Sequence, residues 1–562
     1  MKQQYIELME QVVGAYTQER MEDYLQRVRE NGVSEHGFPR LTANIGILLS
    51  FGRCRHLKPL FEEMMDICCR EAAGAFSRYY QAGTEFSVRE LICAILALEK
   101  TQLFSEEKLC QWKDGLRQIN PETAYRVVVK PPIDRASNWV SFSVASEQAR
   151  KAVGLAEDND DFIDRQILSQ LLGFENGGMY LEGEDHPMVY DLVPRLQLAV
   201  ALYFGYSGRY ADQLEQLLLR GAECSLYMQS VTGELPYGGR SAQFVHNEAT
   251  QGAYFEFAAW AWNRKGNREK AACYKAAAEL SKAAVASFLQ GQAKYHVKNR
   301  YPNDSKFGCE KYAYFDKYMV TAASFLYLSW MFSDDAILPG QCPAGSENYI
   351  FHTSAAFHKT FCKYGDYFVE YDTNADFHYD ANGLGRVHKK GAPSVLCLSV
   401  PFAQKPTYYI GTENPSEMSI CCGIADADGV VMSCQPGTRY ILLDQEQTED
   451  CVQVTWLCQL SNGEVFRESC RIDGDGVHLR FWGDHPLRCF LPVFTCDGAG
   501  QSVIELTDGG LQVEWEGWRC RYTADRQICS GEKMYANRNG QYSLYTVDGE
   551  NAVQIHICME KI

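Results

Sequence analysis

The chain has 562 residues, 46% of them hydrophobic and 12% aromatic, and a formal net charge of −18. This length exceeds one ordinary core and suggests several domains. No apolar run approaches the ~18 residues of a transmembrane helix. Nucleic acids and anionic membranes are bound through clustered Lys and Arg, so the negative balance disfavours both as partners.

The first twenty residues, MKQQYIELMEQVVGAYTQER, are polar and amphipathic. They lack the apolar segment and the small-residue cleavage site of a secretion signal, so we expect a cytoplasmic protein. Because cytosolic thiols stay reduced, the 22 cysteines are interpreted as small core residues and not as a disulfide framework. Neither paired CxxC nor HExxH spacing occurs, nor a Walker A or GxGxxG motif, so we predict neither a metal nor a cofactor.

From the N-terminus to about residue 335, apolar residues recur at spacings of three and four, which is typical of amphipathic helices. Examples are LICAILALEKTQLFSEEKLCQWKDGL (91–116) and LVPRLQLAVALYFGYSG (192–208). Several such segments end in Gly, as helix C-termini do, and the connections between them are short. No repeat of fixed period is visible. We therefore predict a closed (α/α) toroid of helical hairpins at residues 1–340.

The pattern changes after about residue 345. Short alternating runs such as CVQVTWLCQL (451–460) and VHLRFWG (477–483) are separated by turn sequences such as DGDG (473–476). Alternation with period two and Gly- and Asp-rich turns indicate antiparallel strands. We predict a β-sandwich at residues 341–562.

Four stretches of the helical region contain more polar and charged residues than a connection between two helices requires. These are RASNWVSF (135–142), NGGMYLEGEDHPMVYD (176–191), GELPYGGRSAQFVHNEATQGAYFEF (233–257) and KYHVKNRYPNDSKFGCEKYAYFDKYM (294–319). The second and third share one order, in which a Gly pair and aromatic residues precede a carboxylate at a helix start. In a toroid, alternate connections meet on one face, where loops carry function. We expect residues 138–139, 182–191, 237–248 and 312–318 to line one cleft.

A purely structural interpretation exists for the same residues. Asp191 and Glu248 would be stabilised at helix N-termini by the positive end of the helix dipole. Ser137 or Asn138 would cap a helix, and Trp139 would belong to the core. The repeated assortment of groups favours a functional site over this interpretation.

The segments SNWV and NGGMYLEGEDHPMVYD resemble the Asn-Trp and Gly-Gly-x-Tyr-x-Glu-Gly elements of α/α-toroid carbohydrate-active enzymes that carry a C-terminal β-sandwich. The heparinase II/III-like uronate lyases belong to this group, and toroid glycoside hydrolases that act on glucuronides show a related pattern. The motifs cover a short part of the chain, whereas the architecture covers all of it. The resemblance implies an enzyme whose partner is a uronic-acid-containing oligosaccharide or a glucuronide.

Hydrolysis of the glucuronidase type, by an exo-acting enzyme, is the main hypothesis. It needs two carboxylates that flank the glycosidic bond, and we choose Asp191 and Glu248. Arg240 would grip the uronate carboxylate with its two-pronged guanidinium. The carboxylates gathered in residues 182–191 favour hydrolysis, since a lyase must stabilise an enolate-like dianion.

Cleavage by β-elimination is the alternative that the resemblance implies. The substrate carboxylate must then be neutralised while a Tyr or His removes the C5 proton. Candidates for neutralisation are Asn138, Arg240, His246 and Asn247, and candidates for the base are Tyr190 and His186. Further contacts with the sugar are expected from Trp139, Glu182, His186, Tyr237 and Tyr314. A non-catalytic glycan-binding module is a third hypothesis, and the oligomeric state, a homo-oligomer included, stays open.

Overall fold

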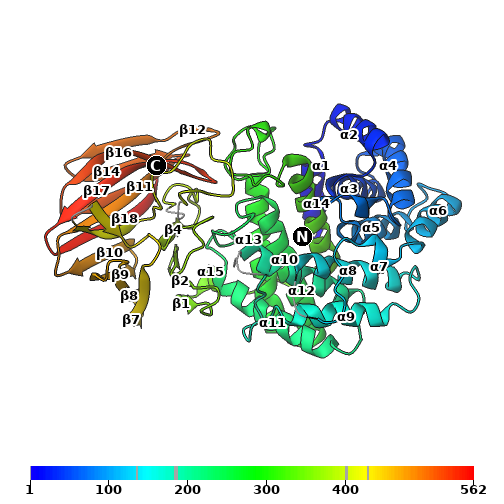
Figure 1. Ribbon diagram of the computed structural model, residues 1–562, viewed down its shortest axis with the longest axis horizontal. Helices are drawn as coiled ribbons and strands as arrows, with labels where there is room; N and C mark the ends of the chain where they lie inside the picture. Colours follow the sequence, from blue (N-terminus) through cyan, green and yellow to red (C-terminus); the bar gives the residue numbers. More distant parts are fainter. Residues whose placement is uncertain (1, 134–136, 183–187, 399–402, 427–428) are drawn as a thin grey trace.

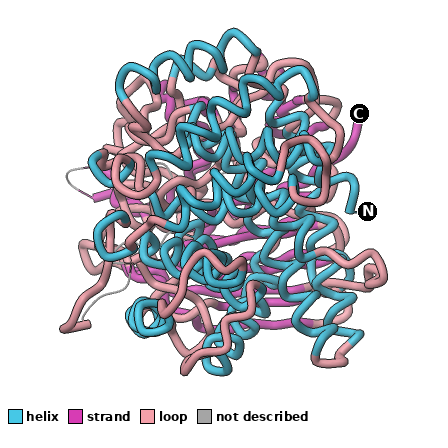
Figure 2. The backbone as a smooth tube through the Cα atoms, turned by 90° about the vertical axis from the view of Figure 1, so that its right-hand side faces the viewer, coloured by secondary structure: helices cyan, strands magenta, loops and turns pink. Residues whose placement is uncertain are grey.

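The computed structural model describes residues 2–133, 137–182, 188–398, 403–426 and 429–562. Figure 1 shows a helical domain, coloured blue to green, beside a β domain coloured yellow to red. Seen from the helical end, in Figure 2, the helices lie in front of the strands. The predicted class, a helical toroid followed by antiparallel β-structure, is confirmed. Helices give way to strands between α15 (Pro343–Ser346) and β1 (Tyr349–His352).

Among the described residues, six helices form a closed inner ring in which each contacts the next. In order around the ring they are α3 (Gly37–Ser50), α5 (Val88–Leu98), α8 (Asn138–Ala152), α10 (Met188–Tyr203), α12 (His246–Arg264) and α14 (Phe315–Phe332), and α14 contacts α3. The sequence of α12, HNEATQGAYFEFAAWAWNR, has small or apolar residues on every side, and nearly all of it is buried. Such a helix is stable only where other elements surround it.

Outer helices pack against the inner ring with one apolar stripe each. They are α4 (Lys58–Glu71), α6 (Glu106–Arg117), α9 (Asp160–Leu171), α11 (Ala211–Met228) and α13 (Arg268–Phe288). Shorter or peripheral helices are α2 (Gln18–Asn31), α7 (Pro121–Ala124), η1 (Arg55–Leu57), η2 (Phe76–Arg78), η3 (Thr84–Phe86) and η4 (Asn303–Ser305). Within the part of the chain that is described, no helix is long and apolar enough to cross a membrane.

The N-terminal helix α1 (Lys2–Val13) completes the outer layer by packing on α14, α3 and α13. It buries Ile6, Met9 and Val12. Tyr5 also donates a hydrogen bond of 2.7 Å to Glu256 of α12. The helix that begins the described chain thus packs on α14, some three hundred residues later.

The described residues of the β domain form three antiparallel sheets. The first is a meander of β1, β2 (Lys359–Tyr364), β3 (Tyr367–Asp372) and β4 (Gly383–Lys389). The largest has the order β13 (Val503–Thr507), β14 (Gly510–Trp515), β15 (Trp518–Ala524), β18 (Ala552–Lys561), β10 (Val477–Gly483), β9 (Val465–Ile472), β8 (Val452–Gln459), β7 (Arg439–Gln447). The third has the order β16 (Ile528–Asn537), β17 (Gly540–Gly549), β11 (Leu487–Asp497), β5 (Cys421–Asp426), β6 (Gly429–Met432), with β12 (Gly500–Gln501) beside β11.

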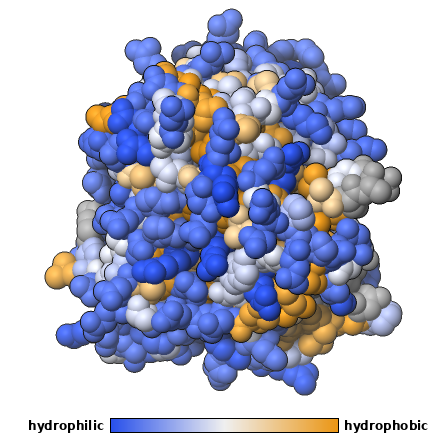
Figure 3. Space-filling view, turned by 90° about the vertical axis from the view of Figure 1, so that its left-hand side faces the viewer, coloured by the Kyte–Doolittle hydropathy of each residue, from blue (hydrophilic) through white to orange (hydrophobic). Residues whose placement is uncertain are grey.

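The two larger sheets share one apolar core, which makes them a sandwich. Along β8, Val452, Val454, Trp456 and Cys458 are buried in strict alternation, and this period of two is the pattern visible in the sequence. The outer end of the β domain is mostly hydrophilic with separate apolar areas (Figure 3).

Glu468 of β9 is an acid inside this core, with 1% of its surface exposed. Tyr371 donates a hydrogen bond of 2.9 Å to its Oε1 atom. Burial raises the pKa of Glu468 from 4.5 to about 7. The folded protein therefore holds a proton that the unfolded chain releases at lower pH.

The free energy of unfolding of the wild type is expected to fall more steeply with rising pH than that of the Glu468→Gln variant. A group whose pKa is raised by folding contributes stability that is complete below its unfolded pKa and is lost as the pH rises through its folded pKa. Gln has no such proton, so the difference in free energy of unfolding should shift in favour of the variant by up to about 3 kcal/mol between pH 4 and 8. Urea unfolding measures this, with Glu446→Gln, which changes an exposed glutamate of β7, as control. A difference that stays constant with pH would contradict it.

Candidate active site

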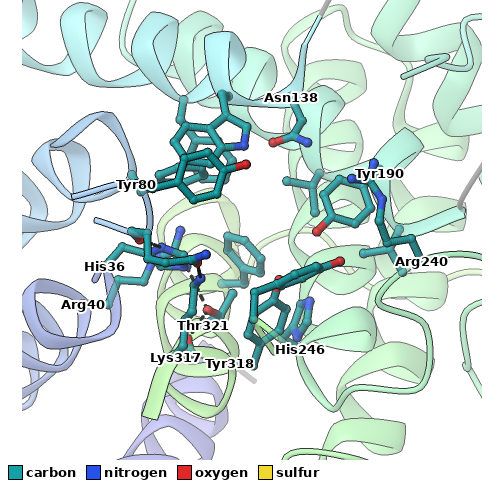
Figure 4. A pocket seen from close by; sticks show the side chains of 18 residues that line it. His36, Arg40, Tyr80, Asn138, Tyr190, Arg240, His246, Lys317, Tyr318 and Thr321 are labelled. Carbon is teal, nitrogen blue, oxygen red and sulfur yellow. Dashed lines mark hydrogen bonds between the residues drawn. The ribbon is translucent and has the colours of Figure 1, made fainter. Parts of the chain in front are cut away.

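A pocket lies at the end of the toroid where the inner helices begin. Around it stand residues of these helices, several of them in first turns, and residues of the connections that lead into them (Figure 4). They are His36, Arg40, Tyr80, Gln81, Phe86, Asn138, Trp139, Phe142, Val189, Tyr190, Val193, Arg240, His246, Tyr312, Lys317, Tyr318, Thr321 and Phe325. Helix N-termini present unpaired backbone N–H groups and a partial positive charge. Several of them around one pocket favour an anionic ligand.

One wall of the pocket is aromatic. Trp139 packs edge-on against Phe86, with ring centroids 4.6 Å apart, and lies beside Tyr80 at 5.8 Å. Flat apolar faces of this kind with a polar edge suit the mixed surface of a sugar ring.

Asn138 and Arg240 form a second wall, and Glu182, which lies behind them, joins them into one hydrogen-bonded unit. The backbone N–H of Asn138 donates to Glu182 Oε1 at 2.8 Å, and the side-chain amide of Asn138 donates to the same oxygen. Arg240 donates to Glu182 Oε2 at 2.7 Å, and its guanidinium lies 4.1 Å from the ring centroid of Tyr190. Glu182 therefore holds an amide and a cation in fixed positions at the pocket edge.

Hydroxyl groups gather next to this unit. Ser241 Oγ lies 3.3 Å from Tyr190 Oη and 3.2 Å from Tyr312 Oη, within hydrogen-bond distance of both. Burial raises the pKa of Tyr318 well above its usual value, and the neighbouring Tyr190 raises it further. Burial likewise raises the pKa of Tyr312. Tyr312 and Tyr318 therefore keep their protons at neutral pH.

His246 begins α12 at the floor of the pocket and is 4% exposed. Burial, with a smaller contribution from Arg40, lowers its pKa to about 3. Its ring centroid lies 5.1 Å from that of Tyr318. At neutral pH it is a neutral imidazole, which donates one hydrogen bond and accepts another.

Opposite Arg240, the pocket has a cationic wall from α3 and α14 (Figure 4). Arg40 donates to Thr321 Oγ1 at 2.9 Å and to Glu90 at 3.3 Å. Lys317 donates to the side-chain carbonyl of Gln81, and burial lowers the pKa of this lysine. The sequence prediction missed His36 and Arg40, although NGVSEHGFPRL (31–41) also places polar residues just before an inner helix.

Asp191, predicted as a catalytic carboxylate, is not among the residues that line the pocket. It is 1% exposed and forms an ion pair with Arg195, which is itself completely buried. Arg195 Nε donates to Asp191 Oδ1 at 2.9 Å, and the backbone N–H of Tyr180 donates to the same oxygen at 2.6 Å. Its carboxylate thus holds the segment before α10 to the helix itself.

Glu248, the second predicted carboxylate, also lies outside the pocket lining. Completely buried, it pairs with Lys298 at 2.5 Å and accepts a hydrogen bond of 3.1 Å from the backbone N–H of Leu235. Lys298 lies 3.8 Å from Glu234, which faces Arg386 of β4 at 3.5 Å. Glu248 therefore belongs to an ionic cluster between the toroid and the first β-sheet.

The remaining predicted residues divide into two groups. Asn138, Trp139, Tyr190, Arg240 and His246 line the pocket, with Glu182 bonded behind them. Tyr237, Asn247 and Tyr314 are outside its lining: Tyr237 donates to Ser394 and packs under Arg386, and Asn247 donates to the carbonyl of Ser241. His186, with Glu184 and Asp185, lies outside the described residues.

The pocket lining is positively charged in the part of the chain that the structure describes. Among the lining residues that the structure describes there are Arg40, Arg240 and Lys317 but no Asp or Glu. The described residues also contain no group of three or more His, Cys, Asp or Glu side chains arranged to hold a metal ion. The described lining of the pocket thus combines cations, the amides of Asn138 and Gln81, tyrosines and other aromatic side chains, and the histidines His36 and His246.

Comparison of the sequence with protein-family models and with curated proteins gives no match. Solved structures with a similar arrangement include heparinase III, at 10% identity and a TM-score of 0.45, over 85% of this chain and 69% of that one. A mutant of heparan sulfate lyase HepC from Pedobacter heparinus has 10% identity and a TM-score of 0.37, over 90% and 76%. A family 88 glycosyl hydrolase from Bacteroides vulgatus has 10% identity and a TM-score of 0.36, over 59% and 99%. These similarities concern the fold alone.

Proposed function

We propose that this protein is a lyase that cleaves uronic-acid-containing oligosaccharides by β-elimination. The observation that carries the proposal is the composition of the pocket, whose described lining has three cations, two amides and several tyrosines but no carboxylate. β-Elimination needs positive groups or hydrogen-bond donors for the substrate carboxylate and a phenol or imidazole for proton transfer. Hydrolysis needs two carboxylates beside the bond.

The reaction assigns a role to each wall. Arg240 and Asn138 bind the uronate carboxylate and stabilise the negative charge that develops when the C5 proton leaves. Tyr190, as phenolate, takes that proton on its Oη atom. The electron pair of the C5–H bond forms the C4–C5 double bond, and the bond between C4 and the glycosidic oxygen breaks. Tyr318, which holds its proton, donates it to the departing oxygen.

His246 supplies a neutral hydrogen-bonding group beneath these residues. A protonated imidazole would add a positive charge, but the low pKa of His246 keeps its ring neutral at neutral pH. Arg40 and Lys317 on the opposite wall favour an acidic group on the neighbouring sugar. The proposed substrate is therefore an oligomer with more than one acidic group.

Hydrolysis through Asp191 and Glu248 has less support from this geometry. Each carboxylate is buried against its own cation, Arg195 and Lys298. Freeing either for catalysis leaves an unpaired buried charge, which costs about 3–5 kcal/mol. The structural interpretation of both residues is the simpler one.

Incubation with uronate oligosaccharides and with 4-nitrophenyl glucuronide tests the proposal. A lyase generates an unsaturated uronate, which absorbs in the ultraviolet, and consumes no water. A hydrolase releases nitrophenol and saturated sugars. Saturated products alone would refute β-elimination, and substrate binding without any product would favour the glycan-binding module.

Arg240→Lys tests recognition of the uronate carboxylate. A lysine keeps the charge but loses the two-pronged geometry that matches a carboxylate, so kcat/KM should fall by about 1.5–3 kcal/mol, equivalent to roughly 10- to 150-fold. Kinetics and thermal melting measure the effect, with Arg220→Lys, an exposed arginine on α11, as control. If Tm falls and kcat/KM of the remaining folded enzyme does not, Arg240 serves only to anchor Glu182.

A further inference from the structure

The turn between β16 and β17 carries two residues of the β domain to the edge of the toroid. Asn537 Oδ1 accepts hydrogen bonds from the backbone N–H groups of Asn539 at 2.8 Å and Gly540 at 3.3 Å, which fixes the turn. A Cβ atom at Gly540 would meet the carbonyl oxygen of Cys496 at 2.4 Å, so glycine is required there. Arg538 and Asn539, at the tip, are 4% and 1% exposed.

Arg538 forms a buried ion pair with Glu310, which belongs to the connection before α14. Its Nη1 atom lies 3.0 Å from Glu310 Oε2, and its Nη2 atom donates to Oε1. Nη1 also donates to the carbonyl of Gly308 at 2.7 Å, and the guanidinium lies 4.1 Å from the ring centroid of Tyr408. A two-pronged, buried pair of this kind fixes position as well as charge.

Glu310 passes this constraint to the loop that carries Arg240. Its Oε1 atom accepts a hydrogen bond of 2.7 Å from the backbone N–H of Ser241. Ser241 has a φ of 58° and Gln243 a φ of 66°, both in the left-handed region that non-glycine residues rarely adopt. Such a backbone persists only when its surroundings impose it. Asn539 adds a contact of 3.3 Å to the side chain of Gln243.

Ser241 is the last link before the pocket. Its Oγ atom contacts the hydroxyl groups of Tyr190 and Tyr312. A continuous series of hydrogen bonds and ion pairs thus joins Arg538 in the β-sandwich to Tyr190 in the toroid. Glu310 also raises the pKa of Tyr312 and Tyr318, after burial and Tyr190, so a change in its charge reaches these groups as well.

We propose that Arg538 is a positioning residue that holds the hydroxyl of Tyr190 in place through Glu310 and Ser241. The β-sandwich is then a part of the catalytic apparatus, although its own side chains lie outside the described pocket lining. The kinetic consequences rest on the proposed lyase function, in which Tyr190 takes the proton. The structural claim, that Arg538 sets the surroundings of Tyr190, stands independently of that reaction.

Kinetics of Arg538→Met and Arg538→Lys give the first test. Misplacement of a reacting group by about 1 Å costs up to ~10²-fold in rate, so Arg538→Met should lower kcat by roughly 10- to 100-fold with KM changed less than about 2-fold. The pH profile of kcat should also change, because the charge of Glu310, which acts on Tyr312 and Tyr318, is then no longer balanced by Arg538. Arg538→Lys should recover part of the loss. Arg488→Met, which removes an exposed ion pair with Asp548 in the same sheet, is the control.

Nuclear magnetic resonance of protein labelled with ¹³C at tyrosine Cζ gives the second test, which needs no activity. The signal of Tyr190 is assigned by its absence in Tyr190→Phe. It should shift in Arg538→Lys and in Ser241→Ala but not in Arg488→Met. Should Arg538→Met fail to fold, Arg538→Lys and Glu310→Gln serve in its place. An unchanged Tyr190 signal with an unchanged kcat would refute the proposal.

The two tests also separate the two proposals. A wild-type protein without lyase activity, but with a Tyr190 signal that responds to Arg538→Lys, would refute the proposed function and keep the positioning role. If the wild-type enzyme has lyase activity, but substitution of Arg538 changes neither the Tyr190 signal nor the pH profile, the positioning role is refuted and the proposed function is kept.

Discussion

Tyr190→Phe is expected to lower kcat by about 10³-fold, within the 10²–10⁴-fold range of general base catalysis. The variant keeps the ring that packs against Arg240 at 4.1 Å and removes only the hydroxyl. KM and Tm should therefore change little. Initial rates from the absorbance of the unsaturated product, with circular dichroism for folding, measure the effect.

Tyr314→Phe is the matched control for that variant. Tyr314 lies in the connection that leads into α14, as Tyr312 does, but it is not part of the described pocket lining. Its loss of a hydroxyl should leave kcat within about 2-fold, as expected for a group that takes no part in proton transfer. If Tyr190→Phe keeps more than a tenth of the wild-type kcat, another group removes the C5 proton.

Asp191→Asn is expected to destabilise the fold by about 3–5 kcal/mol, because it leaves Arg195 charged and buried without its partner. Enzyme that remains folded should keep a kcat within several-fold of the wild type. Urea unfolding gives the first quantity, and active-site titration of the folded fraction gives the second.

Asp212→Asn serves as control, since Asp212 occupies the first turn of α11 and is exposed. A carboxylate there interacts with the helix dipole by less than about 1 kcal/mol. The hydrolytic hypothesis makes the opposite prediction for Asp191→Asn, namely a large loss of kcat with little loss of stability. That result would return Asp191 to the catalytic site.

The fold could be predicted from the sequence because both domains display their period openly. The outer helix α6 buries Leu109, Trp112 and Leu116, at spacings of three and four, and β8 alternates buried and half-buried residues. Closure of the ring between α14 and α3 had no such signal, since contacts between distant segments leave no local pattern. The toroid was inferred from the absence of a repeat and from short connections.

The site was predictable in part for the same reason. Asn138, Tyr190, Arg240 and His246 stand at helix starts, and a ring of hairpins gathers these starts at one end. The ion pair between Asp191 and Arg195 also has a signal in the sequence, because Arg195 follows Asp191 by four positions and lies on the same helix face. The partner of Glu248 was not, because Lys298 comes from a connection fifty residues later.

The packing of α1 on α14 has a consequence for folding during synthesis on the ribosome. α1 emerges before the inner helices, yet α14, on which it packs, is synthesised last among them. Until then the nascent toroid is an open arc with an apolar edge at each end, and such edges promote aggregation of partly folded chains. We expect stalled chains that end before residue 315 to bind chaperones that hold apolar segments, and release to follow once α14 has left the exit tunnel.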